Sequence, residues 1–409
     1  MIKKYLSTSL KTGFTSLLSL IFSFLLLKLQ LKFIGVGDRG IMILAQANVA
    51  VLASLLRFGV GQSVIRAIPD YSRSIISSNF IFLTFIQAVL IAITISLLFY
   101  FTNFFGNNLD NSSVFAIASF GVSSLLFNAI SNFSFLLHSS KVFLIQILLL
   151  GVFNIGLIWF AGIFFYMDIK TVLYCITTAQ ICVLIFLSKF LPKFKIIYIK
   201  KELIKRLIFE GASSIGWSFI KDLSYKIDLL IFGNILEKFD FGIYSVLQNL
   251  CQSVWRVTDS IMASYSKYLL GLKKEDYIKF TNLLIFMLTL VSFLGIICAY
   301  FIITPVFGFI AGMDMSQYLF PALILLFAVL IFNIWKLVAN FFIQVGRNIP
   351  MYITLCLLIS FFFVLKNFVG TLTEAVATTA GVYLIITLLI LFFYKTAIRE
   401  KQFRSGDLN

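Results

Sequence analysis

Apolar residues follow one another in long stretches along the whole of this chain, and only short polar segments separate them. A stretch of about 20 apolar residues can cross the roughly 30 Å hydrocarbon core of a bilayer as a helix. The pattern predicts twelve such helices, at approximately 12–34, 41–66, 77–101, 113–137, 143–166, 170–190, 207–235, 241–264, 281–304, 319–345, 349–367 and 374–396. We therefore expect an all-α polytopic membrane protein with short loops.

The composition supports this fold class and leaves little room for catalysis. Of the 409 residues, 60% are hydrophobic and 12% are charged, whereas about a quarter of a soluble domain is charged. The single histidine and the lack of a Cys-x-x-Cys pair argue against a metal site, and no cofactor is expected. GVGDRG at 35–40 fits the dinucleotide-binding pattern, but it follows a hydrophobic helix and not a strand. We interpret it as a tight outer loop, and nothing in the sequence argues for an enzyme.

Basic residues outnumber acidic ones, 33 to 17, which gives a net charge of +16. In a soluble protein this excess would suggest nucleic-acid binding, but in a membrane protein it reflects the enrichment of Lys and Arg in cytoplasmic segments. If both termini are cytoplasmic, the basic residues of the outer segments are only Lys28, Lys32, Arg39, Lys170, Lys238 and Lys366. This asymmetry predicts a cytoplasmic location for both termini.

The chain is expected to consist of two halves, residues 1–200 and 201–409. Between them, Lys189 to Arg206 form the most basic stretch of the sequence, which we interpret as a topology-setting linker; the alternative is a site for anionic lipid headgroups. The segment GIMILAQ starts at Gly40 and GIYSVLQ at Gly242, in the second span of each half. Such weak similarity indicates a parallel internal repeat, a common plan among transporters.

Eight charged residues lie at membrane depth in the predicted spans. Each would cost roughly 2.5–3.5 kcal/mol at the centre of the bilayer, so together they must face one another or a wet cavity. These residues are Arg57, Lys221, Asp222, Lys226, Asp228, Arg256, Asp259 and Lys336. Five are bases and three are acids, an excess that favours an anionic cargo.

Polar residues recur at helical spacing and indicate shared interior faces. The stripes are Gln248, Gln252 and Arg256, followed by Asp259; Asn333, Lys336 and Asn340; and Gln46 with Arg57. Helix–helix ion pairs are the simpler explanation for Asp222 with Lys226, at i and i+4, and for Arg256 with Asp259. Arg57 and Lys336 have no acid within reach on their own helices, so for these two we favour a functional role.

Two stretches of the chain are similar to a known family. The first ends in a pattern FGxGxxxxR, at Phe58, Gly59, Gly61 and Arg66, and the second carries Asp228, Gly233, Gly242 and Tyr244 in a pattern iDxxilG…lG.Y. In both, the chain resembles the polysaccharide (O-antigen) flippases of the multidrug/oligosaccharidyl-lipid/polysaccharide (MOP) exporter superfamily. The residue before the FG turn is often acidic in that family, whereas here it is Arg57.

The resemblance implies a V-shaped pair of six-helix lobes around a central cavity. It implies a flippase that moves an undecaprenyl-pyrophosphate-linked oligosaccharide, such as an O-antigen unit of lipopolysaccharide, across a bacterial inner membrane by alternating access. The expected partners are this lipid-linked glycan and membrane lipids, with a polysaccharide polymerase and a chain-length regulator as further candidates, and no nucleic acid. By resemblance to related flippases, Arg57 and Arg256 would line the lumen.

Roles for the remaining polar residues follow from their chemistry. Basic side chains can bind a pyrophosphate, and amides can bond sugar hydroxyls; the carboxylates are candidates for carrying a coupling ion. The expected substrate-binding residues are Arg57, Arg256, Lys336, Lys221, Lys226, Gln46, Gln248, Gln252, Asn333 and Asn340, and the expected ion-coupling residues are Asp222, Asp228 and Asp259.

Three alternatives stay open. A peptidoglycan-precursor flippase would look similar but commonly has more than twelve helices. A cation-drug antiporter of the same superfamily shares the architecture, but an organic cation favours an acidic lumen. A polysaccharide polymerase or ligase is also polytopic and basic, yet it usually needs a large periplasmic loop, and the longest outer loops expected here are 102–112 and 305–318.

Overall fold

The computed structural model describes the chain in eight segments, and every regular element within them is a helix. These segments are residues 2–57, 59–68, 70–101, 112–137, 140–252, 274–312, 316–345 and 347–399. Within them, eight helices are long and apolar enough to cross a membrane. Seven each match one predicted span, and the eighth, Leu18–Leu56, covers the first two. The prediction of an all-α multi-pass membrane protein is confirmed.

The helices pack into two compact units. One unit is residues 25–234, and the other combines residues 235–409 with residues 1–24. The chain therefore passes between the units twice, once within its first helix and once near residue 234. The expected boundary between two halves at residue 200 stays a prediction.

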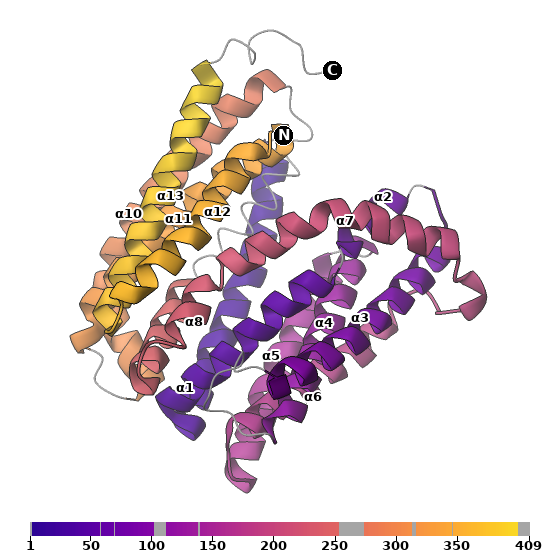
Figure 1. The fold of residues 1–409 in the computed structure, drawn as a ribbon, viewed down its shortest axis with the longest axis horizontal. Coiled ribbons are helices and arrows are strands. Elements are labelled where there is room, and N and C mark those ends of the chain that lie inside the picture. Colours follow the sequence, from indigo (N-terminus) through magenta and orange to yellow (C-terminus); the bar gives the residue numbers. More distant parts are fainter. Residues whose placement is uncertain are drawn as a thin grey trace. The chain divides into compact units, whose positions relative to one another are not determined.

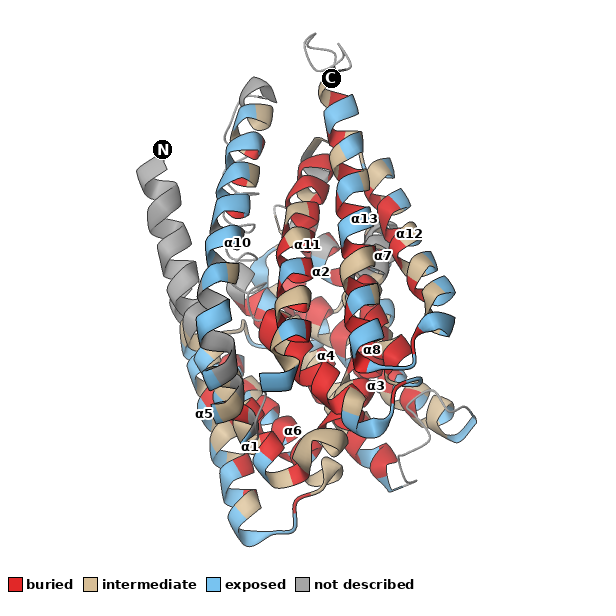
Figure 2. Cartoon of the chain, turned by 90° about the vertical axis from the view of Figure 1, so that its left-hand side faces the viewer, coloured by how far each residue is buried: buried red, intermediate tan, exposed pale blue. Residues whose placement is uncertain are grey.

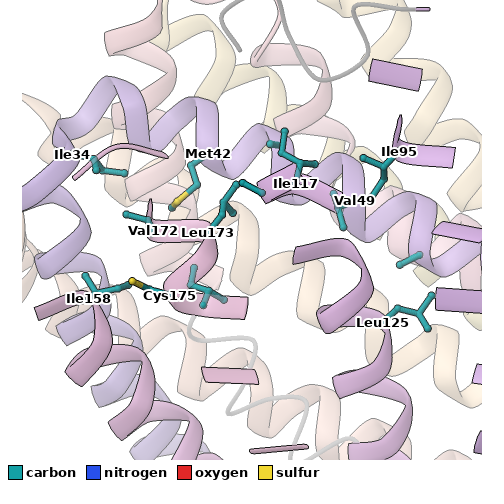
Figure 3. Close-up of a cluster of buried hydrophobic side chains, with 14 of the residues drawn as sticks. Ile34, Met42, Val49, Ile95, Ile117, Leu125, Ile158, Val172, Leu173 and Cys175 are labelled. Carbon is teal, nitrogen blue, oxygen red and sulfur yellow. The ribbon is translucent and has the colours of Figure 1, made fainter. Parts of the chain in front are cut away.

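The unit 25–234 contains most of the N-terminal helices (Figure 1). In chain order its elements are α1 (Ile2–Leu56, from residue 25), α2 (Val60–Ala67), α3 (Arg73–Phe101), α4 (Ser113–Leu137), α5 (Ser140–Phe164), α6 (Ile169–Ser188), the 3₁₀ turn η1 (Ile196–Tyr198), α7 (Lys201–Ser224) and α8 (Ile227–Phe232). A core of fully apolar side chains joins α1, α3, α4, α5 and α6, and it includes Met42, Ile95, Ile117 and Ile158 (Figure 3).

Hydrogen bonds between α4 and α6 recur at a nearly constant separation in sequence. Lys170 Nζ donates to Ser112 Oγ at 2.8 Å, where the two helices begin. Further along both helices, Ser123 Oγ donates to Gln180 Oε1 at 2.6 Å. Because these partners are separated by 58 and 57 residues, the two helices run parallel and in register over this length.

The predicted outer loop at 35–40 is reduced to a kink at one residue. Gly35 has φ 76° and ψ 174°, whereas the residues on both sides are helical and belong to α1. Only glycine adopts this backbone region readily, because a Cβ atom would be strained there. The two helices predicted on either side of this point are thus present and meet at Gly35. Their connection is shorter than expected, because Arg39 is already a helical residue, with 1% of its surface exposed.

Two further expectations need correction. The predicted span 207–235 is not one helix. α7 ends at Ser224, Lys226 N donates a hydrogen bond to Leu223 O three residues earlier, and α8 begins at Ile227. The predicted outer loop 305–318 is also wrong, because α10 (Lys274–Ala311) continues through Pro305 and a 3₁₀ turn, η2 (Ser316–Tyr318), follows it. The connection between α10 and α11 is thus shorter than expected.

The other unit is built around α11 (Leu319–Val345), most of which is buried (Figure 2). It packs against α10, against α12 (Ile349–Leu365) with its terminal turn η3 (Lys366–Phe368), and against α13 (Leu372–Arg399). The ring of Phe332 stacks on Trp335 and on Tyr383, with centroid distances of 4.9 and 4.3 Å. Trp335 Nε1 donates to Thr354 Oγ1 of α12 at 3.0 Å, so one face of α11 is fixed by aromatic packing.

The start of α6 is set by a side-chain cap. Asp168 lies at the N-cap, where its Oδ1 accepts hydrogen bonds from Thr171 N and Thr171 Oγ1, both at 2.8 Å. Burial acts to raise the pKa of Asp168, but these bonds and the charge of Lys170 outweigh it, so that pKa lies below its usual value. The carboxylate form is therefore the form that caps the helix.

Candidate functional site

Arg57 lies at the end of α1, at a point where the backbone is held from several directions. Its carbonyl oxygen accepts a bond from Val60 N at 3.1 Å and a second from Gln87 Nε2 of α3 at 2.9 Å. Gly59, which follows, has φ 63° and opens α2. The chain thus leaves α1 at Arg57 and enters α2 after Gly59, and bonds to α2 and α3 hold the backbone of Arg57 in place.

The side chain of Arg57 is half-buried and interacts electrostatically with an acidic side chain of another helix. Its Nε is buried and has no hydrogen-bond partner in the described part of the chain. The carboxylate of Asp222 in α7 lies close enough to stabilise the guanidinium charge. Sequence reasoning found no acid on the helix of Arg57, and the fold supplies one from 165 residues further along the chain.

Asp222 and Lys226 do not lie on one continuous helix, as the sequence analysis assumed. Because α7 ends at Ser224, Lys226 lies outside that helix and forms the N-cap of α8, with φ −127°. Asp228 follows in the first turn of α8 and its side chain is fully buried. Lys221 is a residue of α7. The break therefore separates Asp222 from Lys226 and Asp228 along the chain, and the pairing of Asp222 with Lys226 stays a prediction.

In the other unit, the stripe on α11 is where the sequence placed it. Asn333 and Lys336 are buried, Lys336 with 7% of its surface exposed, and Asn340 is half-buried. These residues occupy the face next to the aromatic face of Phe332 and Trp335, since neighbouring positions are about 100° apart around a helix. Lys336 is thus a buried cation near the middle of a largely apolar helix.

The amides of the eighth predicted span lie in a helical segment, residues 238–252. Gln248 is buried and Gln252 is half-buried, and the Nε2 atom of each has no hydrogen-bond partner among the described residues. Gln46, in α1, is half-buried. Arg256 and Asp259 lie outside the described residues.

The sequence analysis missed an uncharged polar seam between α4, α5 and α6. Besides Ser123, the side chain of Gln180 bonds Ser124, and Gln146 Nε2 donates to Ser131 Oγ. Every one of these residues is a small or amide side chain within an apolar stretch, so only their helical spacing could have indicated the seam. Hydrogen bonds of this kind hold neighbouring membrane helices together.

Comparison with known proteins identifies the family. The family model described as "Polysaccharide biosynthesis protein" matches residues 1–266. The chain belongs to this family. The polysaccharide biosynthesis match covers α1 to α8 and the helix that carries Gln248, and therefore includes Arg57 and Asp222.

Solved structures share the fold at low sequence identity. An inward-facing multidrug resistance MATE family transporter of the MOP superfamily has a TM-score of 0.70 and 11% identity, with 96% of each chain covered. A mutant of the Vibrio cholerae MATE transporter VcmN has a TM-score of 0.65 and 14% identity over 98% of each chain. A MOP superfamily transporter from Pyrococcus furiosus has a TM-score of 0.57 and 10% identity, with 98% of this chain and 96% of that chain covered. No curated protein matches the chain.

Together these findings give this polysaccharide biosynthesis protein the fold of the MATE transporters of the MOP superfamily. The resemblance seen in the sequence is confirmed for the family and for the fold.

Proposed function

We propose that this protein is a flippase for an undecaprenyl-pyrophosphate-linked oligosaccharide, such as an O-antigen unit, in a bacterial inner membrane. The observation that carries the proposal is the family match over residues 1–266. Arg57 departs from the flippase pattern, which often has an acid at this position, but a cation there suits an anionic cargo. Both termini are cytoplasmic in this proposal. The glycan crosses by alternating access, and an ion gradient drives the cycle.

The pyrophosphate is the part of the cargo that a basic interior would recognise. It carries about two negative charges, and a guanidinium can bind such a group through two parallel hydrogen bonds. Arg57 and Arg256 contact the pyrophosphate in this mechanism, with Lys336, Lys221 and Lys226 adding to the positive field. The amides of Gln46, Gln248, Gln252, Asn333 and Asn340 bond the sugar hydroxyls.

The interaction between Arg57 and Asp222 suggests how cargo and ion are coupled. While Asp222 is ionised, it neutralises Arg57 and competes with the cargo. Protonation of Asp222 removes this competition, so the guanidinium becomes available to the pyrophosphate. Asp228 and Asp259 are further candidates for carrying the coupling ion.

The basic character also separates this proposal from a cation-drug antiporter of the same fold. Among the described residues, the buried charged side chains are Arg39, Asp228 and Lys336, so bases outnumber acids. The Pyrococcus furiosus relative is described by the words "reverse polarity of binding pocket suggests different function". Pocket polarity is thus a property by which members of this superfamily can be told apart.

A series of variants at Arg57 tests the proposal. Arg57→Ala should abolish export of the glycan while leaving the amount of folded protein near normal. Arg57→Lys should impair export in part, because lysine keeps the positive charge but cannot donate the two parallel hydrogen bonds of a guanidinium. The matched control is Lys238→Gln, which removes an exposed cation. Surface glycan and folded protein are measured in the same cells. Equal loss of folded protein in Arg57→Ala, with recovery in Arg57→Ala/Asp222→Asn, would instead assign the pair to structure.

Binding can be tested without the glycan. Farnesyl pyrophosphate is a short-chain probe of the charged group, and a ligand that binds only the folded protein raises the melting temperature as its concentration exceeds the dissociation constant. It should stabilise the purified wild type and Asp222→Asn, and it should fail to stabilise Arg57→Ala. Stabilisation of all three to the same extent would contradict a role for Arg57 in cargo binding.

Lys336 is tested separately, because it lies in the other unit. Lys336→Gln keeps the polarity and much of the size but removes the charge. In our proposal this variant folds normally and loses export. If Lys336 served only to stabilise the fold, the variant would be unstable, and removing the acid that pairs with Lys336 would restore its stability. Normal export by a stable variant would contradict both roles.

A further inference from the structure

The basic stretch between α6 and α7 is held in place by one helix. Ser77, Ser78 and Asn79 are three consecutive residues of α3, and their side chains are completely buried. Each of them bonds the backbone of the linker, which runs from Lys189 to Lys200 between the two helices. A linker between helices would ordinarily be free to move, so these bonds call for an explanation.

The bonds follow the linker in order. Ser77 Oγ donates to Pro192 O at 3.4 Å, and Lys195 N donates to Ser78 Oγ at 3.2 Å. Asn79 closes the arrangement with both ends of its amide, since Nδ2 donates to Tyr198 O at 2.8 Å and Oδ1 accepts from Lys200 N at 2.9 Å. The linker backbone is therefore bound to α3 from Pro192 to Lys200.

Side chains on the other side of this backbone are apolar and basic in alternation. Phe194, Ile196 and Ile197 are 44%, 76% and 84% exposed. The lysines of the same segment are also exposed, and these are Lys189, Lys193, Lys195, Lys200 and Lys201. The hydrogen bonds thus direct the backbone inward and leave an exposed face that is both hydrophobic and positively charged.

The position of this face along the chain is informative. The membrane-crossing part of α6 ends at Ser188, and the linker begins at the next residue. The exposed isoleucines thus follow directly after an apolar span, where the lipid headgroups are expected. Apolar side chains flanked by lysines are the composition of segments that lie in the membrane interface and are attracted to anionic lipids.

We propose that the segment Lys189–Lys201 is a pre-formed binding surface for anionic phospholipids of the adjacent leaflet. Phe194, Ile196 and Ile197 insert between the lipid headgroups, and the lysines bind the phosphates around them. Because α3 already orders the backbone, binding costs little further conformational entropy. The surface anchors this end of α3, α6 and α7 in the interface, independently of the cargo.

Charge dependence is measured on the full-length purified protein in detergent. Native mass spectrometry follows the binding of phosphatidylglycerol and of phosphatidylcholine with identical acyl chains. The wild type should prefer phosphatidylglycerol, and Lys193→Gln/Lys195→Gln/Lys200→Gln should lose this preference by roughly fivefold for each lysine removed. The matched control, Lys238→Gln/Lys366→Gln/Lys395→Gln, removes the same number of charges elsewhere and should keep it.

Insertion is measured in nanodiscs of phosphatidylcholine and phosphatidylglycerol with brominated acyl chains. In Ile197→Trp, the fluorescence added relative to the wild type should be quenched by bromine, and less so when the three linker lysines are also replaced by glutamine. Unchanged phosphatidylglycerol preference in the linker triple variant would overturn the proposal. An unquenched indole would also overturn it, because the face would then be a surface for a soluble acidic partner and not for lipid.

Discussion

Replacing Gly35 by alanine isolates the energy stored in a single backbone conformation. The site has open space, because no atom lies within 4 Å of the position that a Cβ would occupy. The backbone dihedrals, φ 76° and ψ 174°, nevertheless lie in a region that is almost restricted to glycine, where another residue costs about 1–3 kcal/mol. Alanine also reduces the freedom of the unfolded chain, which returns up to about 1 kcal/mol. We therefore expect Gly35→Ala to lower the free energy of unfolding by roughly 1–2 kcal/mol.

Gly156→Ala is the matched control. Gly156 is exposed in the middle of α5 and also has no atom within 4 Å of its Cβ position, but its φ is not in the left-handed region. Alanine there should stabilise the helix by about 0.5–1 kcal/mol.

Tryptophan fluorescence during heating of the detergent-solubilised protein provides the assay. At roughly 2–4 °C per kcal/mol for a unit of this size, the melting temperature should fall by about 2–8 °C in Gly35→Ala and rise slightly in Gly156→Ala. If both variants shift in the same direction and to the same extent, the added methyl group and not the backbone is responsible, and the reasoning from the kink fails.

Two other changes have expected outcomes that follow from single contacts. Asp168→Ala removes the cap of α6 and should lower the free energy of unfolding by about 1 kcal/mol. Because folding lowers the pKa of Asp168, this contribution is present above the unfolded pKa near 3.9 and is lost as the pH falls through the lower folded pKa. The melting temperatures of the variant and the wild type should therefore converge at acidic pH. Trp335→Phe breaks the bond to Thr354 and should cost about 1–3 kcal/mol, and Trp335→Phe/Thr354→Val should recover part of that loss in the same melts; no recovery would assign the cost to packing alone.

The membrane spans could be predicted because hydrophobic runs and membrane thickness fix them almost independently of tertiary structure. The same holds for the stripe on α11, since Asn333 and Lys336 are brought to one face by the helical repeat alone and both are buried as expected. Local periodicity is sufficient wherever a helix is regular.

Prediction failed where the backbone departs from regularity or where partners are distant in sequence. A turn confined to Gly35 and a break after Ser224 leave the hydrophobic pattern unchanged, so the loop was expected to extend through Arg39 and the span 207–235 was expected to be one helix. The interaction of Asp222 with Arg57 depends on how α7 packs near the end of α1, which no spacing within either helix encodes.

Because the linker is docked on α3, the peptide bond between Lys195 and Ile196 contributes little to holding the two parts of the chain together. Upstream of the bond between Lys195 and Ile196, Pro192 and Lys195 are tied to Ser77 and Ser78. Downstream of it, the backbone is tied to Asn79, and α7 packs through its buried leucines against α2, α3 and α4. A nick at this bond would therefore produce two polypeptides that remain one folded assembly, each new end held by the same helix.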